Sequence, residues 1–269
     1  MIPAYNHADY LYDALVSVYS SLSVNLEVIV VDDGSTDHTE SIVQKFPEAR
    51  YFKQRNMGAF AAINTGVSLS SHKRIAILND DDLYTPHYLS NVLKIQSFTG
   101  TELVATRPTL IGSGDKLHQL VFHQQVAQDK LSELGPHLSL LSINWFISTS
   151  GLAFSRNLFD AIGGFRDLDM HHDIDFVLRA AFSGNFQFAS NLDGSWKYRC
   201  HTANASSKIK GENAKSEIPF FLQIPLTELS NHGVSKNQVL KLLGHGMTEI
   251  EKIRILDDYN ELRYLTKNS

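Results

Sequence analysis

The sequence has little cysteine and no long apolar run. Its single cysteine, Cys200, excludes an internal disulfide framework and a zinc site built from several cysteines. The most apolar run, residues 26–31, is too short to cross a bilayer, and the chain does not open with a basic-then-apolar leader. We therefore expect a cytoplasmic protein without a transmembrane segment, in which Cys200 is a small buried side chain.

Positive charge is also scarce. The 269 residues include 24 Lys and Arg against 29 Asp and Glu, which gives a formal net charge of −5. A dedicated nucleic-acid-binding protein usually carries a basic patch and a high pI, so we expect no nucleic-acid partner. A chain of this length with 43% hydrophobic residues can bury a large core without disulfides or structural metals.

Short β-branched runs alternate with amphipathic stretches over the first 110 residues. This alternation is typical of βα units around an open, mostly parallel sheet flanked by helices, which is an α/β fold. The expected strands cover residues 2–5, 26–31, 50–52, 75–78 and 103–106. The expected helices cover residues 9–22, 37–46, 58–69 and 86–98, and Asp37 is the expected N-cap of the second.

The rest of the chain is less regular. Residues 109–144 do not favour one element type, and the stretch 119–125 suits a strand or a helix equally. Beyond residue 208, apolar periodicity over residues 239–243 and 247–265 predicts helices. We therefore expect a helical C-terminal extension.

Small polar and acidic residues follow each expected strand of the first half. They are Asn6 and His7, then Asp32 to Ser35, then Asn56 to Gly58, and finally Asn79 to Asp82. In an open α/β sheet, ligands bind in the crevice outside the carboxyl ends of the strands. We therefore expect these side chains to converge on one site.

Three successive aspartates, Asp80 to Asp82, carry the strongest chemical signal. They repel one another unless they are solvated or neutralised, and a divalent cation bound by carboxylates and substrate phosphates removes that conflict. The common glycine-rich phosphate cradles, G-x-G-x-x-G after a strand and G-x-x-x-x-G-K-[ST], are missing. The pattern favours a metal-bridged diphosphate, and a solvated turn before a capped helix stays open as the alternative.

Several motifs occur together in a fixed order. They are Ile2-Pro3-Ala4-Tyr5-Asn6, Val30-Val31-Asp32-Asp33-Gly34-Ser35, Asn56-x-Gly58, Leu78-Asn79-Asp80-Asp81-Asp82, Gly163-Gly164-Phe165, His172-Asp173-Ile174-Asp175 and Tyr198-Arg199-x-His201. This set resembles the family 2 glycosyltransferases of the GT-A fold. The resemblance implies a catalytic domain over residues 1–207, with a nucleotide-sugar-binding half (1–108) and an acceptor-binding half (109–207). Residues 208–269 would be the helical extension.

The resemblance also implies a role for each matching residue. The nucleotide sugar would contact Pro3, Tyr5, Asp33, Asn56, Gly58 and Asp80, with Asp33 towards uracil and Asp80 by the ribose. Asp81 and His201 would hold a divalent cation, manganese or magnesium, and Asp173 would be the general base. Two positions depart from the family: Asn79 replaces the first Asp of the D-x-D motif, and His172 replaces the Glu before the base.

The implied reaction is inverting transfer of a sugar from a nucleotide-diphosphate donor, expected to be UDP-linked. The acceptor would be a hydroxyl of a saccharide or lipid-linked glycan, as in surface polysaccharide biosynthesis, and peripheral contact with the inner face of a membrane stays open. The segment 144–151 is the candidate acceptor pocket, where Trp145 suits stacking on a sugar ring or core packing equally. A degenerate nucleotide-binding homologue and a sugar nucleotidyltransferase are the alternatives, although no basic glycine-rich loop follows the first strand.

Overall fold

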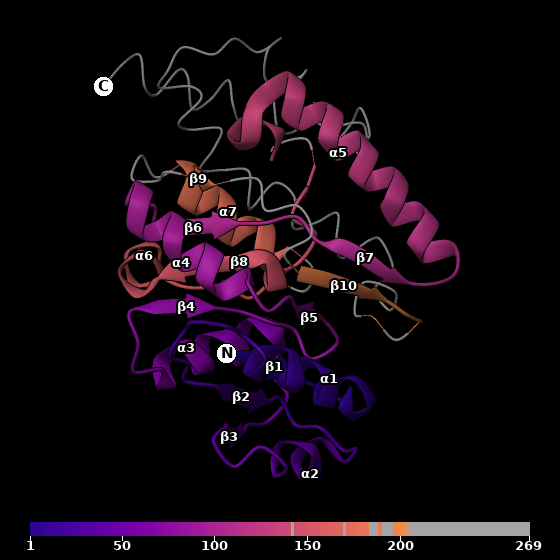
Figure 1. Cartoon of the computed structure of the whole chain (residues 1–269), viewed down its shortest axis with the longest axis vertical. Helices are drawn as coiled ribbons and strands as arrows, with labels where there is room; N and C mark the ends of the chain where they lie inside the picture. The colour runs from indigo at the N-terminus through magenta and orange to yellow at the C-terminus, as the bar shows by residue number, and fades with distance from the viewer. Residues whose placement is uncertain (141–142, 169–170, 183–187, 190–195, 203, 205–269) are drawn as a thin grey trace.

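A computed structural model describes residues 1–140, 143–168, 171–182, 188–189, 196–202 and 204 (Figure 1). The expected helical extension at 208–269 lies outside these residues and stays a prediction. Among the described residues, no helix combines the length and the apolar character that crossing a membrane requires. Cys200 is a buried free thiol, as expected.

Strands and helices alternate along the first half, as the sequence pattern predicts. The strands are β1 (Ile2–Ala4), β2 (Ile29–Asp32), β3 (Arg50–Lys53), β4 (Arg74–Ala76), β5 (Leu83–Tyr84), β6 (Leu103–Ala105), β7 (Thr109–Gly112), β8 (Leu152–Ser155), β9 (Phe188–Ala189) and β10 (Trp196–Cys200). The helices are α1 (Ala8–Tyr19), α2 (Thr39–Val43), α3 (Ala59–Leu69), α4 (Tyr88–Thr99), α5 (Asp115–Ser139), α6 (Arg156–Ile162) and α7 (His172–Phe182), with a 3₁₀ turn η1 (Thr149–Gly151) before β8.

The described strands form three hydrogen-bonded sheets, in the orders β1-β2-β3, β5-β10-β7 and β4-β8-β6-β9. Met1 connects the first sheet to the third, because its ammonium donates to Ala76 O at 2.7 Å and its carbonyl accepts from the Leu78 N–H at 3.1 Å. Four of the seven strand pairs are parallel and three are antiparallel. The predicted α/β class with a mostly parallel sheet is confirmed, and the antiparallel pairs involve β8 and β10, which the sequence pattern did not indicate.

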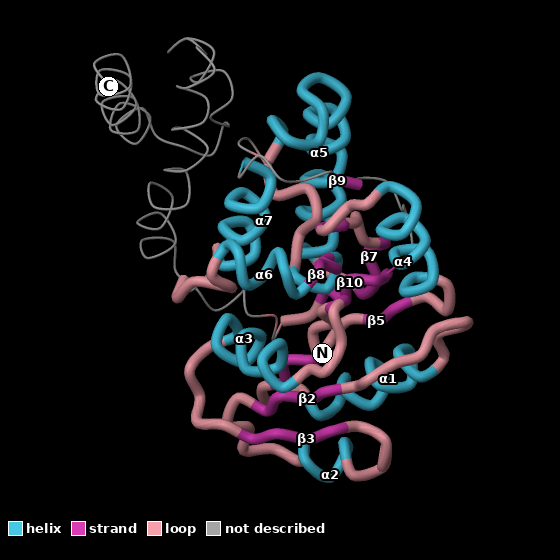
Figure 2. Tube along the Cα trace, turned by 90° about the vertical axis from the view of Figure 1, so that its left-hand side faces the viewer, coloured by secondary structure: helices cyan, strands magenta, loops and turns pink. Residues whose placement is uncertain are grey.

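The near-continuous apolar run before Asp32 is buried on both faces. Val28 and Val30 pack into the cluster that contains α1 and α2 side chains, whereas Ile29 and Val31 pack with Ala62 of α3. Side chains alternate between the two faces of a strand, so helices must cover both. Figures 1 and 2 show α2 beyond β3 at one end of the molecule and α5 at the other.

Strands from the second half of the chain are inserted among strands of the first. β8 pairs with both β4 and β6, and β10 pairs with both β5 and β7. In the described part of the chain, residues before and after residue 108 therefore form strands of the same sheets. The division into a donor half and an acceptor half at this residue stays a prediction. This insertion brings residues near 150 and 200 to the Asp80–Asp82 loop.

The second predicted helix begins later than expected, and Asp37 is not its N-cap. α2 runs over Thr39–Val43 with His38 as its N-cap residue. Asp37 instead accepts from the Thr39 N–H at 3.0 Å and from the Ala8 N–H of α1 at 3.0 Å. One carboxylate thus serves the N-termini of two helices, which only the tertiary contact between the two loops makes possible.

A cavity of about 430 Å³ surrounds Met1 and the first residues of β1, β2 and β4. It is lined mainly by apolar side chains, among them Val28, Ile75 and Val92. The polar residues that the sequence singled out follow the last residues of the strands instead. The cavity is therefore separate from the site described next.

Candidate functional site

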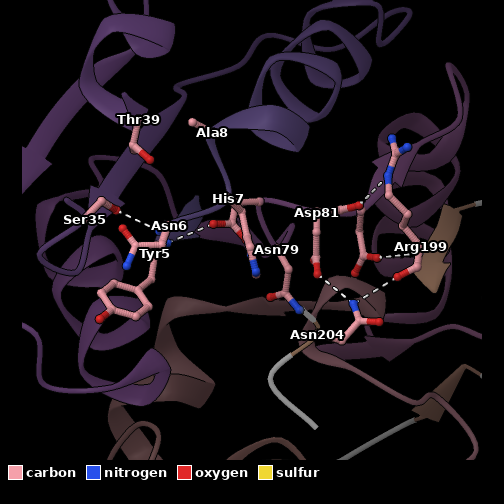
Figure 3. A network of polar contacts seen from close by, with 12 residues as sticks. Tyr5, Asn6, His7, Ala8, Ser35, Thr39, Asn79, Asp81, Arg199 and Asn204 are labelled. Carbon is pink, nitrogen blue, oxygen red and sulfur yellow. Dashed lines mark hydrogen bonds and ion pairs between the residues drawn. The ribbon is translucent and has the colours of Figure 1, made fainter. Parts of the chain in front are cut away.

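The loop after β1 is hydrogen-bonded to the loop after β2. The Asn6 N–H donates to Ser35 Oγ at 3.0 Å, and the Asn6 side-chain oxygen accepts from the Thr36 N–H at 2.8 Å. Asn6 has a φ of +54°, a conformation that Asn tolerates better than most residues. Figure 3 shows Asn6 beside Ser35, with Tyr5 adjacent. The two loops therefore form one polar edge at the carboxyl ends of β1 and β2.

Asp32 anchors this edge as a buried carboxylate. It accepts from the Ser35 N–H at 2.7 Å and from the Tyr51 hydroxyl. Burial by itself would raise the pKa of Asp32, but these hydrogen bonds and the charge of Lys53 lower it overall. Asp32 is therefore ionised, and its carboxylate holds the surrounding loop through these hydrogen bonds.

Asp33 joins the loop after β2 to the start of α3. Its Oδ2 accepts from the Gly58 N–H at 2.8 Å, and its Oδ1 accepts from the Met57 N–H at 3.0 Å and from Gln54 Nε2 at 2.8 Å. A carboxylate is stabilised at a helix N-terminus, where backbone N–H groups lack helical partners. Asp33 therefore orders the 54–58 loop, and its predicted contact with uracil stays a prediction.

Gly34 allows the loop after β2 to pass close to Asn56. Its φ is +82°, and a Cβ at this position would lie 3.0 Å from the Asn56 backbone nitrogen. Glycine meets both the conformational and the steric demand. The Asn56 side chain is exposed next to this close approach.

The three aspartates of the loop after β4 are buried but have different partners. Asp80 Oδ2 accepts from the Tyr5 N–H at 2.9 Å, and Asp80 Oδ1 lies 2.9 Å from His7 Nδ1. Asp82 accepts from Ser150 Oγ at 2.6 Å and from the Arg199 N–H at 3.0 Å. Asp80 and Asp82 are therefore engaged by protein donors.

The pKa values of these two carboxyls reflect their burial. Burial raises the pKa of Asp80, a hydrogen bond from His7 opposes this effect, and the charge of Asp81 adds to it. Burial, followed by the charge of Asp81, raises the pKa of Asp82 well above its usual range. Ionising three neighbouring carboxyls in a buried loop costs free energy, and a positive charge placed beside them would lower this cost.

Asp81 contacts the segment after β10. Its Oδ2 lies 2.9 Å from His201 Nε2 and 2.9 Å from Asn204 Nδ2. Figure 3 shows the Asp81 and Asn204 side chains pointing towards each other, beside Arg199. The predicted metal-ligand pair Asp81 and His201 is therefore brought into direct contact.

The donor set around Asp81 fits a divalent cation. Asn204 Oδ1 accepts from the His201 N–H and from Lys116 Nζ, each at 2.9 Å, so the Asn204 amide nitrogen faces Asp81 Oδ2, Arg199 O and His201 Nε2. His201 Nε2 lies 2.9 Å from Asp81 Oδ2, within hydrogen-bond distance. Once Nε2 offers its lone pair, a carboxylate oxygen and an imidazole nitrogen at this distance are suitable ligands for one shared cation.

The Asn79 side chain binds the 148–150 segment rather than the side chains of the aspartates beside it. Its side chain accepts from Thr149 Oγ1 at 2.8 Å and donates to Ser148 Oγ at 3.3 Å, and its N–H donates to Ser150 Oγ at 2.9 Å. A carboxylate could accept but not donate. The departure from the D-x-D pattern therefore suits the hydroxyl partners that Asn79 has here.

Asp173 lies buried in the first turn of α7. Its Oδ2 accepts from Asn144 Nδ2 at 3.2 Å. Burial raises the pKa of Asp173, and the charge of His172 with nearby hydrogen bonds partly opposes the shift. A carboxyl with these surroundings is a stronger base than an exposed one once it is ionised.

Asp175, one turn further along α7, has a structural role. Its fully buried carboxylate accepts from both Arg166 and Arg179. Arg179 also donates to Ile162 O and, at 2.7 Å, to Gly164 O. This network attaches α7 to the end of α6 and so holds the turn that carries Asp173.

Trp145 is not an acceptor-facing aromatic. Its side chain is fully buried in the core cluster, and its ring packs against Phe146 with centroids 5.8 Å apart. Of the two interpretations that the sequence left open for Trp145, the structure supports core packing and not stacking on a sugar ring. A side chain with no exposed area cannot offer its face to a ligand without rearrangement of the core.

The structure brings several predicted residues together. Tyr5 contacts Asp80, Gly58 contacts Asp33, and Asp81 contacts His201. Pro3 is buried in β1, where it pairs with Val31 of β2. The sequence placed His7 among the polar residues at the strand ends and Asn144 in the candidate acceptor segment, but gave neither an individual role, and it did not single out Lys116. The position of His7 at the end of the first strand is the signal that pointed to it.

The fold and this acidic site at the strand ends define a GT-A-type α/β protein. The family model for Glycosyl transferase family 2 matches residues 1–163, which is more than half of the chain. The chain therefore belongs to glycosyl transferase family 2.

Curated relatives agree with this assignment. An uncharacterized glycosyltransferase, alr2836, of a Nostoc species is 28% identical over 267 residues, which cover 91% of this chain and 76% of the relative. The chain is also similar to longer Rickettsia glycosyltransferases and spans 31%, 55% and 36% of three of them. Because this chain spans only part of these relatives, an activity of the whole proteins is a proposal for this chain.

Solved structures share the fold. TarS of S. aureus, residues 1–349 in complex with UDP-GlcNAc, matches with a TM-score of 0.67 and 17% identity, covering 98% of this chain and 71% of that chain. The mannosyltransferase PcManGT of Pyrobaculum calidifontis, in complex with GDP-Man and Mn²⁺, matches with a TM-score of 0.57 and 19% identity, covering 97% and 68%. At these identities the likeness shows the GT-A fold.

Proposed function

We propose that this glycosyltransferase transfers a sugar, with inversion, from a UDP-linked donor to a hydroxyl of a saccharide or lipid-linked glycan in surface polysaccharide or glycan biosynthesis. The reaction is one displacement, in which the acceptor hydroxyl attacks the anomeric carbon opposite the departing diphosphate. Its proton goes to Asp173. We propose action at the cytoplasmic side of a membrane, with peripheral contact.

The observation that carries the proposal is that hydrogen bonds at both ends of the segment 144–150 connect Asp173 to the aspartate loop. Asn144 donates to Asp173 and accepts from the Ile147 N–H at 2.9 Å. The next residues, Ser148 to Ser150, bind Asn79, and Ser150 also binds Asp82. The segment 144–150 thus fixes the candidate base relative to the candidate donor site, which supports a shared reaction centre.

The donor would bind at the polar edge formed by the loops after β1, β2 and β3. Asp33 orders the 54–58 loop, and Tyr5 is 43% exposed at the same edge. UDP is the proposed nucleotide because the family resemblance places Asp33 towards uracil. The complexes of TarS with UDP-GlcNAc and of PcManGT with GDP-Man are compatible with a nucleotide-sugar donor.

Asp173 is suited to accept the hydroxyl proton. It is ionised above its raised pKa, and the Asn144 amide holds one carboxylate oxygen in place. Asp81 and His201 are the residues that would hold a divalent cation, which when bound supplies positive charge beside the departing diphosphate. Asp82, engaged by Ser150 and Arg199, keeps the backbone of this loop in position.

The proposal is tested by calorimetric titration with UDP, GDP, CDP and TDP, with and without Mn²⁺. We expect UDP to bind tightly only with Mn²⁺, and Asp81→Ala to abolish that binding. Asp173→Asn is expected to retain UDP binding and to lose transfer from the cognate UDP-sugar by about 10²–10⁴-fold, the usual contribution of a general base.

Asp160→Asn is the matched control, because Asp160 is an exposed carboxyl on the neighbouring helix α6. Unchanged binding and transfer are expected for this variant. Equal turnover in Asp173→Asn and the parent would remove the base assignment. Absence of binding by every nucleotide would instead favour the degenerate homologue.

A further inference from the structure

His7 occupies an N-cap position without acting as a cap. It precedes α1, and its side chain accepts no hydrogen bond from the helix. The Ala8 N–H at this terminus is instead bound by Asp37 from the loop after β2. Side-chain oxygen atoms cap helices effectively, and an imidazole is not among the preferred groups. His7 therefore stands at the start of α1 without capping it.

The ring of His7 is turned towards the aspartate loop. Its Nδ1 lies 2.9 Å from Asp80 Oδ1, while the other Asp80 oxygen accepts from the Tyr5 N–H. Both groups are largely buried, with 14% of the His7 side chain and 8% of the Asp80 side chain exposed. An ionised Asp80 can only accept, so Nδ1 then carries the hydrogen, and in the neutral His7 ring Nε2 has the lone pair.

His7 also lies beside the proposed cation ligands. The rings of His7 and His201 have centroids 5.4 Å apart and planes at 90°. A ligand atom from each of His7, Asp81 and His201 lies within 4.8 Å of the other two. His201 Nδ1 is buried without a hydrogen-bond partner among the described residues. These three side chains come from the loops after β1, β4 and β10.

We propose that His7 is a third protein ligand of the divalent cation and that Asp80 positions its ring. This inference rests on the proposed function, which assigns the cation to Asp81 and His201. A carboxylate that accepts from one ring nitrogen while the other binds the metal is a recurrent arrangement at metal sites, because it fixes both the tautomer and the ring orientation. Asp80 is then a positioning residue.

The ligand set predicts which cation the site prefers. Mg²⁺ favours an all-oxygen, octahedral environment, whereas an imidazole-containing set binds Mn²⁺ and Co²⁺ more tightly than Mg²⁺. Two imidazoles and one carboxylate therefore favour Mn²⁺. Loss of one imidazole would reduce Mn²⁺ affinity more than Mg²⁺ affinity.

The test is a Mn²⁺ titration of the full chain followed by electron paramagnetic resonance, with and without UDP. We expect His7→Ala to weaken Mn²⁺ binding by about 10–100-fold and Asp80→Asn by about tenfold, the range found when groups that hold metal ligands are removed. Competition with Mg²⁺ should show a reduced Mn²⁺ preference in His7→Ala. The visible spectrum of bound Co²⁺ should change in His7→Ala, which a purely structural role of His7 would not produce.

His38→Ala is the matched control. His38 is also an N-cap histidine without a side-chain capping bond, at α2, and its side chain is 60% exposed. Its removal should leave Mn²⁺ affinity and the Co²⁺ spectrum unchanged.

Two outcomes separate this inference from the proposed function. If His7→Ala binds Mn²⁺ as the parent does while His201→Ala does not, the role of His7 is overturned and the metal site stands. If the parent binds UDP and transfers sugar without any divalent cation, the third-ligand proposal fails and the transferase function remains. Failure of the parent to bind any nucleotide would overturn both.

Discussion

Asp81 Oδ2 lies 2.9 Å from His201 Nε2, although 120 residues separate them along the chain. The register of β10 explains this contact. Lys197 pairs with Leu83 in the antiparallel ladder between β10 and β5, so the residues after Lys197 run beside those before Leu83. The Arg199 N–H accordingly binds Asp82, and His201 follows at Asp81. A shift of this ladder would separate the two residues.

Transfer is expected to depend on the ionisation of Asp173. Burial raises the pKa of Asp173, and only the ionised carboxylate accepts a proton. The rate should therefore be constant above this pKa and fall as the pH decreases through it. We expect a pH–kcat profile with a single acidic limb that lies above the usual range of an Asp. The residual rate of Asp173→Asn should lack this limb, and a limb of unchanged position in that variant would contradict the assignment.

The raised pKa of Asp173 also affects folding stability. It makes stability fall as the pH rises, whereas an ion-paired carboxylate with a lowered pKa makes stability rise with pH. Between the ordinary pKa and the raised one, folded Asp173 holds a proton that the unfolded chain has released, so stability falls as the pH rises through this window. Asp173→Asn should therefore have a higher Tm than the parent at pH 7. The difference should shrink at pH 3, where both states are protonated. Thermal unfolding at the two pH values checks this, with the exposed Asp160→Asn as the control.

Asn79→Asp is expected to destabilise the aspartate loop. The change removes the donor to Ser148 and adds a carboxylate next to Asp80. A lost buried hydrogen-bond partner costs about 1–3 kcal/mol, so the free energy of unfolding at pH 7 should fall by that amount. The loss should be smaller at pH 4. Urea denaturation measures both values, and Asn157→Asp, at an exposed position in α6, should change stability by less than about 0.5 kcal/mol.

Asp37→Ala should weaken the starts of two helices together. It removes the acceptor of the Ala8 N–H of α1 and of the Thr39 N–H of α2. Loss of a capping side chain costs about 0.5–2 kcal/mol. Asp9→Ala is the matched control, because the Asp9 side chain lies in the first turn of α1 and is 87% exposed. Equal stability of the two variants in urea would show that the Asp37 contacts contribute little.

The ion pairs of Asp175 and Glu133 should differ greatly in their contribution to stability. Asp175→Ala leaves the buried guanidinium of Arg179 without its carboxylate, a change that typically costs about 3–5 kcal/mol. Glu133→Ala removes an exposed partner of Lys130, for which about 0–1 kcal/mol is expected. Chemical denaturation of both variants tests this difference. Similar values would mean that the α6–α7 contact does not depend on the Asp175 network.

The local sequence pattern was sufficient to predict most strands and helices of the first half of the chain. The apolar run at 26–31 predicted a strand buried on both faces, and helices do cover both. Gly58 was placed at the start of a helix and is the N-cap of α3. Such features depend on neighbours within a few residues, where periodicity and turn chemistry dominate. Helix ends were less well predicted. The start of α2 at Thr39, for example, depends on the contact of Asp37 with Ala8 at the start of α1.

The irregular stretch 109–144 could not be assigned for a related reason. It contains β7 and α5, and α5 has a kink at Gly135 with a φ of +74°. β7 pairs with β10, which is more than 80 residues away in the chain. A short strand gains its stability from its partner strand rather than from its own sequence, so the local pattern was weak.

The sequence by itself determined where acidic and small polar residues would stand, namely after the strands of an α/β fold, because the alternation of strand and helix fixes which strand ends meet. The tertiary structure decided which of these side chains touch. The insertion of β10 beside β5 brings His201 to Asp81, and the 144–150 segment connects Asp173 to the same loop. It also decided that Trp145 is core. Burial and pairing between distant segments are set by packing of the whole chain, and no local pattern contains that information.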